Sequence, residues 1–366
     1  MFVENVKLMN FRNYEYGNVS FEKGANFIYG SNASGKTNVI ESIYLAATTK
    51  SHRLSKDKEI IMYDKDNAKI SVSFCSANRH NRSDIILNHN KKKQLFKNGV
   101  PVAKSSDMMG FLNVVLFSPD DLRLIKGSPR ERRRMIDIGI CQLKTIYFNA
   151  LINYNHILEQ KNNLLKTNPN SDHIWIWNSK LCEYGGLISY IRQSYIKNIN
   201  YYAQLYHSTI CKEKLRIIYK SGIGMLEETD ISQKQYCEIM ENEIEKNKEK
   251  EIKNRLSLIG PHRDDFTAYL DDKEAKIYGS QGQQRTISIC LKLAEVDIIK
   301  KEKKESPVLL LDDALGELDT KRQKFVLKNF DNIQTIITGT EKKEIENIKN
   351  VNLIKVEDIH VHSFRQ

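Results

Sequence analysis

Residues 30–37, GSNASGKT, match the pattern G-x-x-x-x-G-K-[ST] at every fixed position. Glycines in such a loop let backbone N–H groups turn toward a phosphate, and the positive end of the following helix strengthens the attraction. The Lys36 ammonium would hold the β- and γ-phosphates, and the Thr37 hydroxyl would lie on Mg²⁺. A strand-like stretch precedes the loop and apolar residues at helical spacing follow it, so we expect a P-loop rather than an ordinary glycine turn. The residues expected to contact the nucleotide are Gly30, Ser31, Asn32, Ala33, Ser34, Gly35, Lys36 and Thr37.

A second chemical pattern lies near the other end of the chain. Four apolar residues at 308–311 precede Asp312 and Asp313. This pattern indicates a buried strand that presents a carboxylate at its carboxyl end, where α/β sheets bind their ligands. We expect Asp312 to hold Mg²⁺ through water and Asp313 to polarise the attacking water. The alternative, a strand followed by an acidic surface loop, is weakened by the P-loop.

The distance between these motifs is itself informative, because 275 residues separate Thr37 from Asp312. A large insertion must let both ends meet in one site, an arrangement that resembles the SMC-like group of ABC-type ATPases. Such proteins carry a signature before the acidic strand, and residues 279–285 read GSQGQQR before a helical stretch. Ser280 and the Gly282 amide fall at the N-terminus of that expected helix, which suits a γ-phosphate. Residues 316–319, GELD, resemble the D-loop that follows the acidic strand.

Composition bounds the class of protein. The chain has 366 residues, with 57 Lys and Arg against 46 Asp and Glu, so the net charge is +11. Such an excess favours a polyanionic partner, either nucleic acid or an anionic membrane surface. No apolar run reaches the length of a membrane span, and the first residues lack the apolar core of a signal peptide. The six cysteines form no CxxC pair, which argues against a zinc ribbon or a disulfide scaffold.

The order of elements predicts an α/β fold with a helical insertion. Strand-like runs dominate residues 60–117, and further runs lie at 307–311, 334–338 and 353–356. Between them, Ser128 to Glu131 form a capping-box pattern with proline at the first helical position. Long helical patterns occupy 145–166 and 174–207, and Gly185-Gly186 is expected to bend the second. We therefore predict an ATPase domain from residues 1–120 and 255–366, and an inserted, mainly helical lid or arm from 121–254.

The chain as a whole resembles the RecF family of bacterial recombination mediators, within the SMC-like ABC ATPases. The matching stretches are NFRNY at 10–14, GSNASGKT at 30–37, KSHR at 50–53, LFSPDDLRLIKGSPRERRR at 116–134, GPHRDD at 260–265, SQGQQR at 280–285 and LLLDDALGELD at 309–319. The resemblance implies an α/β, ABC-type ATPase core shaped like an SMC head, with the inserted helical arm. Only the helical middle, 145–250, carries no motif.

The resemblance also implies a mechanism. RecF-like proteins bind ATP, dimerise on it, bind DNA as the dimer and hydrolyse slowly. In the dimer, the signature residues Ser280, Gly282 and Gln283 would meet the γ-phosphate of the partner protomer's ATP. Lys36, Thr37 and Asp312 would instead act on the ATP of their own protomer. Arg12 would also approach the phosphates. RecF works with RecR and RecO at single-strand gaps and helps RecA replace single-strand-binding protein, which implies a cytoplasmic, nucleoid-associated protein.

The sequence departs from the ABC pattern at four places. It has no clear Q-loop glutamine, since residues 118–121 read SPDD at the expected position, and Gly316 stands where the D-loop commonly has Ser. Asp313 stands where these ATPases usually have Glu, and its shorter side chain is consistent with slow turnover. No histidine follows the strand at 334–338, so Thr338 or Thr340 is expected to take the switch role.

An arginine cluster is the expected DNA contact. Arg130, Arg133 and Arg134 share one face of the helix expected after Ser128. Phosphate contact is one interpretation, and a solvated or acid-packed helix face is the other. Arg53 follows the P-loop helix and could reach DNA or the partner protomer.

Two other classes of function compete. An ABC-type ATPase coupled to a protein or membrane partner would share the motifs but leave GPHRDD and RERRR unexplained. A P-loop metabolic kinase would have no signature, so SQGQQR argues against it.

Overall fold

The computed structural model describes residues 1–53, 56–224, 231–316, 318–330, 332–340, 345, 348 and 350–359. Contacts divide the chain into two compact units. The first unit comprises Met1–Asp121 and Glu295–Gln366, and the second unit comprises Leu122–Ala294.

The first unit contains an antiparallel sheet of six strands in the order β2-β1-β4-β5-β6-β7. The strands are β1 (Phe2–Phe11), β2 (Tyr14–Ser20), β4 (Asn67–Ser76), β5 (Arg79–Asn88), β6 (Gln94–Lys97) and β7 (Val100–Val102). In β4 the side chains of Ala68, Ile70, Val72 and Phe74 are buried while their neighbours are more exposed. This alternation is typical of a sheet with one covered face.

The second sheet of this unit is parallel and has the order β14-β3-β13-β12-β8. Its strands are β3 (Ala25–Tyr29), β8 (Val114–Phe117), β12 (Val308–Leu311), β13 (Thr335–Gly339) and β14 (Asn352–Lys355). Every residue of β8 and β12 is buried, as expected of parallel strands covered on both faces. The strands predicted from the apolar runs are confirmed.

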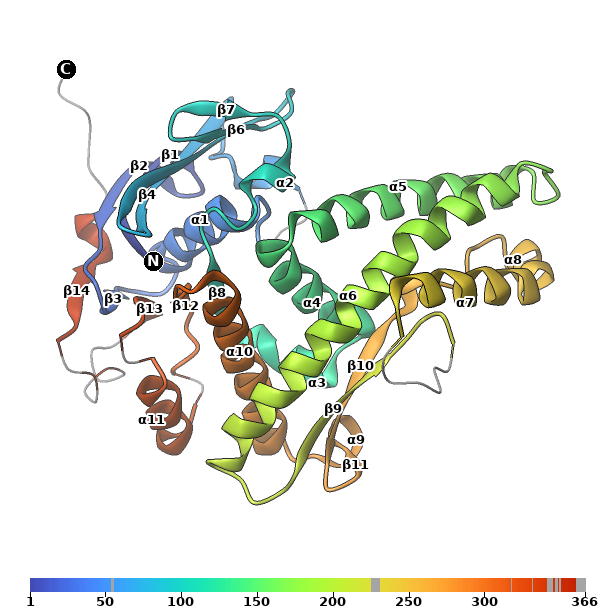
Figure 1. The fold of residues 1–366 in the computed structure, drawn as a ribbon. Helices are drawn as coiled ribbons and strands as arrows, with labels where there is room; N and C mark the ends of the chain where they lie inside the picture. The colour runs from blue at the N-terminus through green and yellow to red at the C-terminus, as the bar shows by residue number, and fades with distance from the viewer. Residues whose placement is uncertain are drawn as a thin grey trace. The chain divides into compact units, whose positions relative to one another are not determined.

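Helix α1 (Lys36–Thr48) lies between these two sheets (Figure 1). It contacts β1, β4 and β5 of the antiparallel sheet, and β8, β12 and β13 of the parallel sheet. Eleven of its residues are buried, because both sides of the helix face a sheet. The short helix α2 (Ser105–Met108) and α11 (Thr320–Lys328) belong to the same unit.

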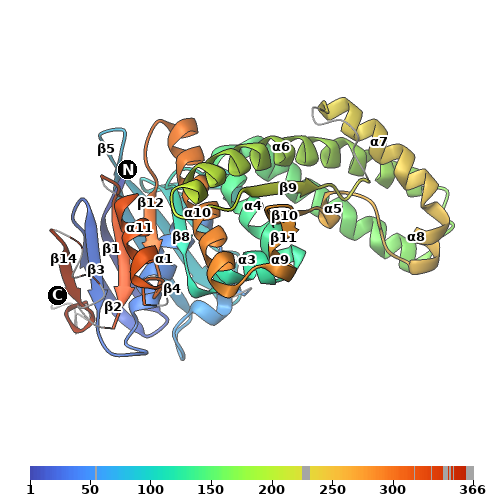
Figure 2. The same ribbon diagram turned by 90° about the horizontal axis from the view of Figure 1, so that it is seen from below.

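The second unit is mainly helical. Its helices are α3 (Arg123–Lys126), α4 (Pro129–Leu143), α5 (Thr145–Thr167), α6 (Ile174–Ser208), α7 (Gln233–Lys246), α8 (Lys248–Asn254), α9 (Ala275–Tyr278) and most of α10 (Gln281–Lys303). Helix α6 runs alongside α5 and α7 in both views (Figures 1 and 2). The predicted helices at 145–166 and 174–207 are confirmed, and so is the capping box, since the Glu131 carboxylate accepts from the Ser128 backbone N–H.

Helix α6 is continuous through Gly185 and Gly186, so these glycines do not interrupt it, and the bend expected there stays a prediction. Both glycines lie where α6 packs against α7. A Cβ on Gly185 would lie 2.7 Å from the Met240 sulfur, and one on Gly186 would lie 3.0 Å from the Cys237 nitrogen. The absence of side chains on α6 therefore lets α7 approach closely.

A three-stranded sheet, β11-β10-β9, completes the second unit. It consists of β9 (Leu215–Lys220), β10 (Asp265–Leu270) and β11 (Lys273–Glu274). Antiparallel pairing of β10 with β9 holds residues 265–270 in this unit, so the compact unit extends to residue 294 rather than to the expected 254. The insertion is thus helical with a small sheet.

Candidate nucleotide-binding site

The P-loop joins β3 to α1 and has the backbone of a phosphate cradle. Gly35, which precedes α1, has a φ of 111°, and a Cβ there would lie 2.8 Å from both Asn13 Nδ2 and the Tyr14 hydroxyl. Only glycine fits this position. Because glycine offers no side chain to cap α1, the first N–H groups of the helix remain available to an anion.

The polar side chains of the loop are poised for a ligand. Lys36 is only 4% exposed, and its ammonium donates to the carbonyls of Gly30 and Ser31, each at 2.9 Å. Among the described residues, Lys36 makes no ion pair and the buried Ser34 hydroxyl has no hydrogen-bond partner. A buried hydroxyl and a cation without a counterion are both stabilised by an incoming phosphate, so this cradle fits the triphosphate of ATP.

The structure brings the two distant motifs together at the carboxyl ends of β3 and β12. The Thr37 hydroxyl donates to Asp312 Oδ1 at 2.8 Å, across 275 residues of sequence. Burial raises the pKa of the Asp312 carboxyl above its ordinary value, and hydrogen bonds from Thr37 and Thr338 oppose that shift. A hydroxyl and a buried carboxylate side by side are oxygen ligands of the kind that Mg²⁺ prefers.

Thr338, at the end of β13, joins this group. Its hydroxyl lies 3.0 Å from Asp312 Oδ1, to which it donates, and 3.0 Å from the Asp313 nitrogen, from which it accepts. Asp313 is exposed and has a φ of 49°, a conformation that is uncommon for a residue other than glycine. Thr338 therefore holds one oxygen of the Asp312 carboxylate and the backbone N–H of Asp313.

His52 is a neighbour of Asp312 that sequence reasoning did not assign to the site. Its Nε2 lies 3.9 Å from Asp312 Oδ2, and its ring packs edge-on against Tyr44 of α1. Arg53 is exposed, and its Nη1 lies 3.5 Å from Asn38 Oδ1, also on α1. The only sequence signal was the KSHR stretch that contains both residues.

Arg12 is held by a carboxylate that the sequence did not single out. Its guanidinium donates to Glu41 Oε2 at 3.0 Å and to Glu41 Oε1 at 2.6 Å. The Ser51 hydroxyl donates to the same carboxylate at 2.5 Å, and Glu41 is fully buried. Glu41 thus links Arg12 to the loop that carries His52.

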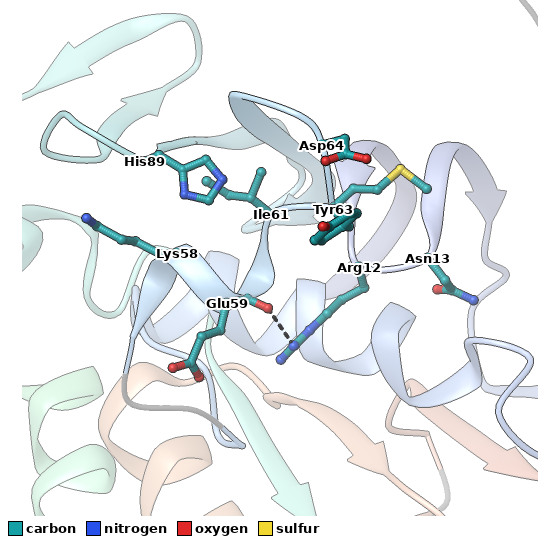
Figure 3. A pocket seen from close by; sticks show the side chains of 9 residues that line it. Arg12, Asn13, Lys58, Glu59, Ile61, Tyr63, Asp64 and His89 are labelled. Atoms are coloured by element: carbon teal, nitrogen blue, oxygen red, sulfur yellow. Dashed lines mark hydrogen bonds between the residues drawn. The ribbon is translucent and has the colours of Figure 1, made fainter.

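A cavity of about 670 Å³ lies beside the P-loop (Figure 3). Arg12 and Tyr63 lie together in its lining, with Asn13 at one side and Lys58 and His89 at the other. Asn13 Nδ2 donates to the Ser34 carbonyl at 3.2 Å, so one residue contacts both cavity and loop.

The signature residues lie in the second unit. Ser280 precedes α10, and its hydroxyl accepts from the Gln283 N–H at 3.2 Å while Gln283 Oε1 accepts from the Ser280 N–H at 2.8 Å. This reciprocal pair is a capping box. Ser280 is exposed, and Gly282 is half-buried. The D-loop stretch includes Glu317, which lies outside the described residues.

The arginines of RERRR divide into two sets. Arg132 is buried and forms two hydrogen bonds with the Asp265 carboxylate, at 2.5 and 2.9 Å. Arg133 is half-buried and donates to the Asp264 carbonyl at 2.7 Å. Arg130 and Arg134 are exposed. RERRR and GPHRDD are therefore in contact with each other, and Arg133 has a packing role. These are the two motifs that an ATPase coupled to a protein or membrane partner would leave unexplained.

The fold and the site define the class of protein as an SMC-like ABC-type ATPase. The family described as RecF/RecN/SMC N terminal domain matches residues 2–362. A solved Smc head domain with an extended coiled coil, bound to the C-terminal domain of ScpA derived from Pyrococcus furiosus, has the same fold, with a TM-score of 0.54 at 16% identity over 96% of this chain and 92% of that chain. The α/β class and the SMC-head core predicted from the sequence are confirmed.

More similar proteins define the family within that class. The DNA replication and repair protein RecF of Lachnospira eligens is 41% identical over 371 residues, which cover 99% of each chain. A solved structure of the recombination mediator protein RecF-ATP in the RecFOR pathway has a TM-score of 0.89 at 33% identity, and covers 94% of this chain and 93% of that one. The chain belongs to the RecF family.

Membership confirms the predicted resemblance and the place of this chain among DNA repair ATPases with an ABC-type core. The comparisons do not favour the alternative of an ATPase coupled to a membrane or other protein partner. Among the helices that the structure describes, none is long and apolar enough to cross a membrane.

Proposed function

We propose that this protein is a recombination mediator, a weak DNA-dependent ATPase that dimerises on ATP and binds DNA at single-strand gaps. The observation that carries the proposal is the 2.8 Å contact between Thr37 and Asp312, because it joins a P-loop to an acidic strand. The RecF relatives and the RecF-ATP structure support the same conclusion.

ATP and Mg²⁺ fit the residues of the site. The backbone of residues 30–37 and Lys36 would bind the phosphates, while Thr37 and Asp312 would hold Mg²⁺, with Asp312 acting through water. When bound, Mg²⁺ supplies positive charge to the β- and γ-phosphate oxygens. Asp313 would orient the attacking water, and Thr338 keeps its backbone in position.

The remainder of the nucleotide would occupy the cavity lined by Arg12, Asn13 and Tyr63. Tyr63 is 88% exposed, so its ring is available for stacking. Arg12 lies in the same lining, where its guanidinium donates two hydrogen bonds to Glu41. Arg12 would contact the phosphates only if at least one of these hydrogen bonds were broken.

The signature residues at the start of α10 would contact ATP only in a dimer. Ser280, Gly282 and Gln283 would meet the γ-phosphate of the partner protomer's ATP, and the exposed N-terminus of α10 suits an anion. Ser280→Arg should spare ATP binding and prevent the ATP-dependent dimer, and a normal dimer in sedimentation would refute the role in trans.

Arg130, Arg134 and Arg53 are exposed cations that would contact the DNA backbone. RecR, RecO and RecA are the proposed protein partners, since the RecF-ATP structure is described within the RecFOR pathway. A cytoplasmic, nucleoid-associated location follows from that role.

Fluorescence anisotropy on gapped duplex DNA, run with ATP, with ADP and without nucleotide, tests the proposal alongside sedimentation. We expect DNA binding and dimerisation to require ATP together. Nucleotide binding without any DNA response would overturn the DNA-clamp function and favour a protein-coupled ATPase.

A further inference from the structure

A groove lies at the edge of the parallel sheet opposite to the P-loop. Its volume is about 1100 Å³, and its lining includes residues 23–25 before and at the start of β3, and Thr335 at the start of β13. The P-loop follows the other end of β3, which at about 3.3 Å per residue is roughly 16 Å away. The groove is therefore separate from the nucleotide site. We call it the lysine groove and define it by Lys23, Phe2, Lys324, Leu327, Lys328 and Ile333.

The floor of the lysine groove is apolar. Ile333 and Phe330 are nearly buried, and Phe330 packs against Phe117 of β8, so the floor rests on the sheet. Phe2 and Leu327 are half-buried and remain partly open to the groove. A pocket for a small ligand occupies about 300–1,000 Å³, so the volume and the partly open apolar side chains suit a peptide.

The rim of the lysine groove is basic. Lys324 and Lys328 are exposed and four residues apart on α11, so their charges repel each other on one face of the helix. Lys23 lies over the Phe2 ring, 4.8 Å from its centroid. Among the described residues these lysines have no carboxylate partner, and the one lining glutamate, Glu305, accepts hydrogen bonds from the Ser76 hydroxyl and the Ala77 N–H. The charge that complements this rim is negative.

We propose that the lysine groove docks an acidic, amphipathic peptide segment of a partner protein. Apolar side chains of the peptide would cover Phe2, Leu327 and Ile333, while its carboxylates would pair with Lys23, Lys324 and Lys328. Nucleic acid fits less well, because its phosphates would pair with the rim and leave the apolar floor uncovered.

The test uses the full chain and a fluorescein-labelled peptide of about twelve residues in which Asp and Glu alternate with Leu and Phe. We expect Lys324→Glu with Lys328→Glu to weaken peptide binding at least about tenfold at low salt. The matched control, Lys7→Glu with Lys69→Glu, makes the same charge change at exposed positions of β1 and β4 and should change binding less than about twofold. Leu327→Ser, which leaves every lysine in place, should weaken binding several-fold.

Three results would overturn the proposal. The first is equal weakening in the control variant, and the second is equally tight binding of an oligoglutamate without apolar residues, since both would reduce the effect to net charge. The third is displacement of the peptide by short duplex DNA together with weaker DNA binding in the Lys324→Glu, Lys328→Glu variant, which would assign the rim to nucleic acid.

Discussion

The P-loop of the first unit and the Arg192 network of the second unit each contain a buried cation, but the two cations have different partners. We define the Arg192 network as Arg192, Asp137, Asp264, Tyr147 and Tyr219. Arg192 donates to Asp137 and Asp264, each at 2.7 Å, and Tyr219 donates to Asp264 at 2.5 Å. Both regions bury a cation, but only the network surrounds it with carboxylates.

The difference lies in what is left without a partner. Asp264 is fully buried, and its two oxygens accept from Arg192, Tyr219 and the Gly222 N–H. Lys36, in contrast, has only backbone carbonyls, and the Ser34 hydroxyl beside it has no partner in the part of the chain that the structure describes. A polar network in which every group has a partner stabilises the fold, whereas a cradle with unpaired groups can bind a ligand. Substitutions in the Arg192 network should therefore lower the free energy of unfolding, and substitutions in the P-loop should lower the affinity for ATP.

Removing the cation of the network should have the largest effect. Arg192→Ala leaves the fully buried Asp264 and the half-buried Asp137 without their counterion, so the free energy of unfolding should fall by about 3–5 kcal/mol. Both tryptophans of the chain, Trp175 and Trp177, lie in α6, so their fluorescence during urea unfolding reports on the second unit. Lys180→Ala, at an exposed position of the same helix, should cost under about 0.5 kcal/mol. A loss below about 1 kcal/mol for Arg192→Ala would mean that the network is not structural.

Removing the cation of the P-loop should change affinity instead. Lys36→Met deletes charge-assisted contacts to the phosphates that are worth about 1.5–3 kcal/mol, so ATP should bind roughly ten- to a hundredfold more weakly. Calorimetric titration with ATP and Mg²⁺ measures this, and the ATP-dependent dimer should be lost with it. Lys50→Met, at the exposed residue just beyond α1, is the control. Unchanged ATP affinity and dimerisation would refute the P-loop assignment.

The comparison can be sharpened with pH, because His262 of GPHRDD lies beside the network. Its Nε2–H donates to the Ser257 carbonyl, and its Nδ1 accepts from the Tyr154 hydroxyl at 2.7 Å. Burial lowers the pKa of His262 to about 4, below the value of about 6.5 in the unfolded chain. The stability it contributes is present above pH 6.5 and is lost as the pH falls toward 4.

Between pH 7 and pH 5 this loss should be about 2 kcal/mol, since one pKa unit corresponds to about 1.4 kcal/mol. Urea unfolding of the wild type and of His262→Gln, followed by tryptophan fluorescence, measures it at both pH values. The variant should be less stable at pH 7 and lose less on acidification. Parallel losses in the two proteins would show that carboxylates alone cause the pH dependence.

The smallest effect concerns the arginines that the network leaves exposed. Arg130→Ala with Arg134→Ala should weaken DNA binding and reduce the slope of log affinity against log salt by up to about two, one unit per phosphate contact. Arg133→Ala, which removes a hydrogen bond to the Asp264 carbonyl, should lower stability and keep the slope. An unchanged slope in the double variant would assign Arg130 and Arg134 to a solvated helix face.

The local motifs were predictable because the structure of each one depends only on residues that are neighbours in the sequence. The P-loop needs only a strand, glycines and a helix start, and Asp312 needs only a buried strand before it. Their meeting through Thr37 followed from both lying at strand ends in one sheet. The capping box at Ser128 is equally local and formed as predicted.

Partners that are distant in sequence and lack a motif of their own were not predictable. Glu41 reads as an ordinary helix residue until the fold places it against Arg12. Asp264 was visible within GPHRDD, but its cation, Arg192, lies 72 residues earlier in a helix without motifs. The glycines of α6 were interpreted from backbone propensity, whereas close packing against Met240 determined their place.

The strand order of the parallel sheet has a consequence for synthesis on the ribosome. In the part of the chain that the structure describes, β3, which leads into the P-loop, pairs only with β13 and β14, which are made last. At about 5–20 residues per second, the 305 residues between Tyr29 at the end of β3 and Thr335 at the start of β13 take roughly 15–61 s to translate. The antiparallel strands β1, β2 and β4 to β7 are complete long before, so the emerging chain must keep an apolar, unpaired β3 from aggregating until the final strands leave the tunnel.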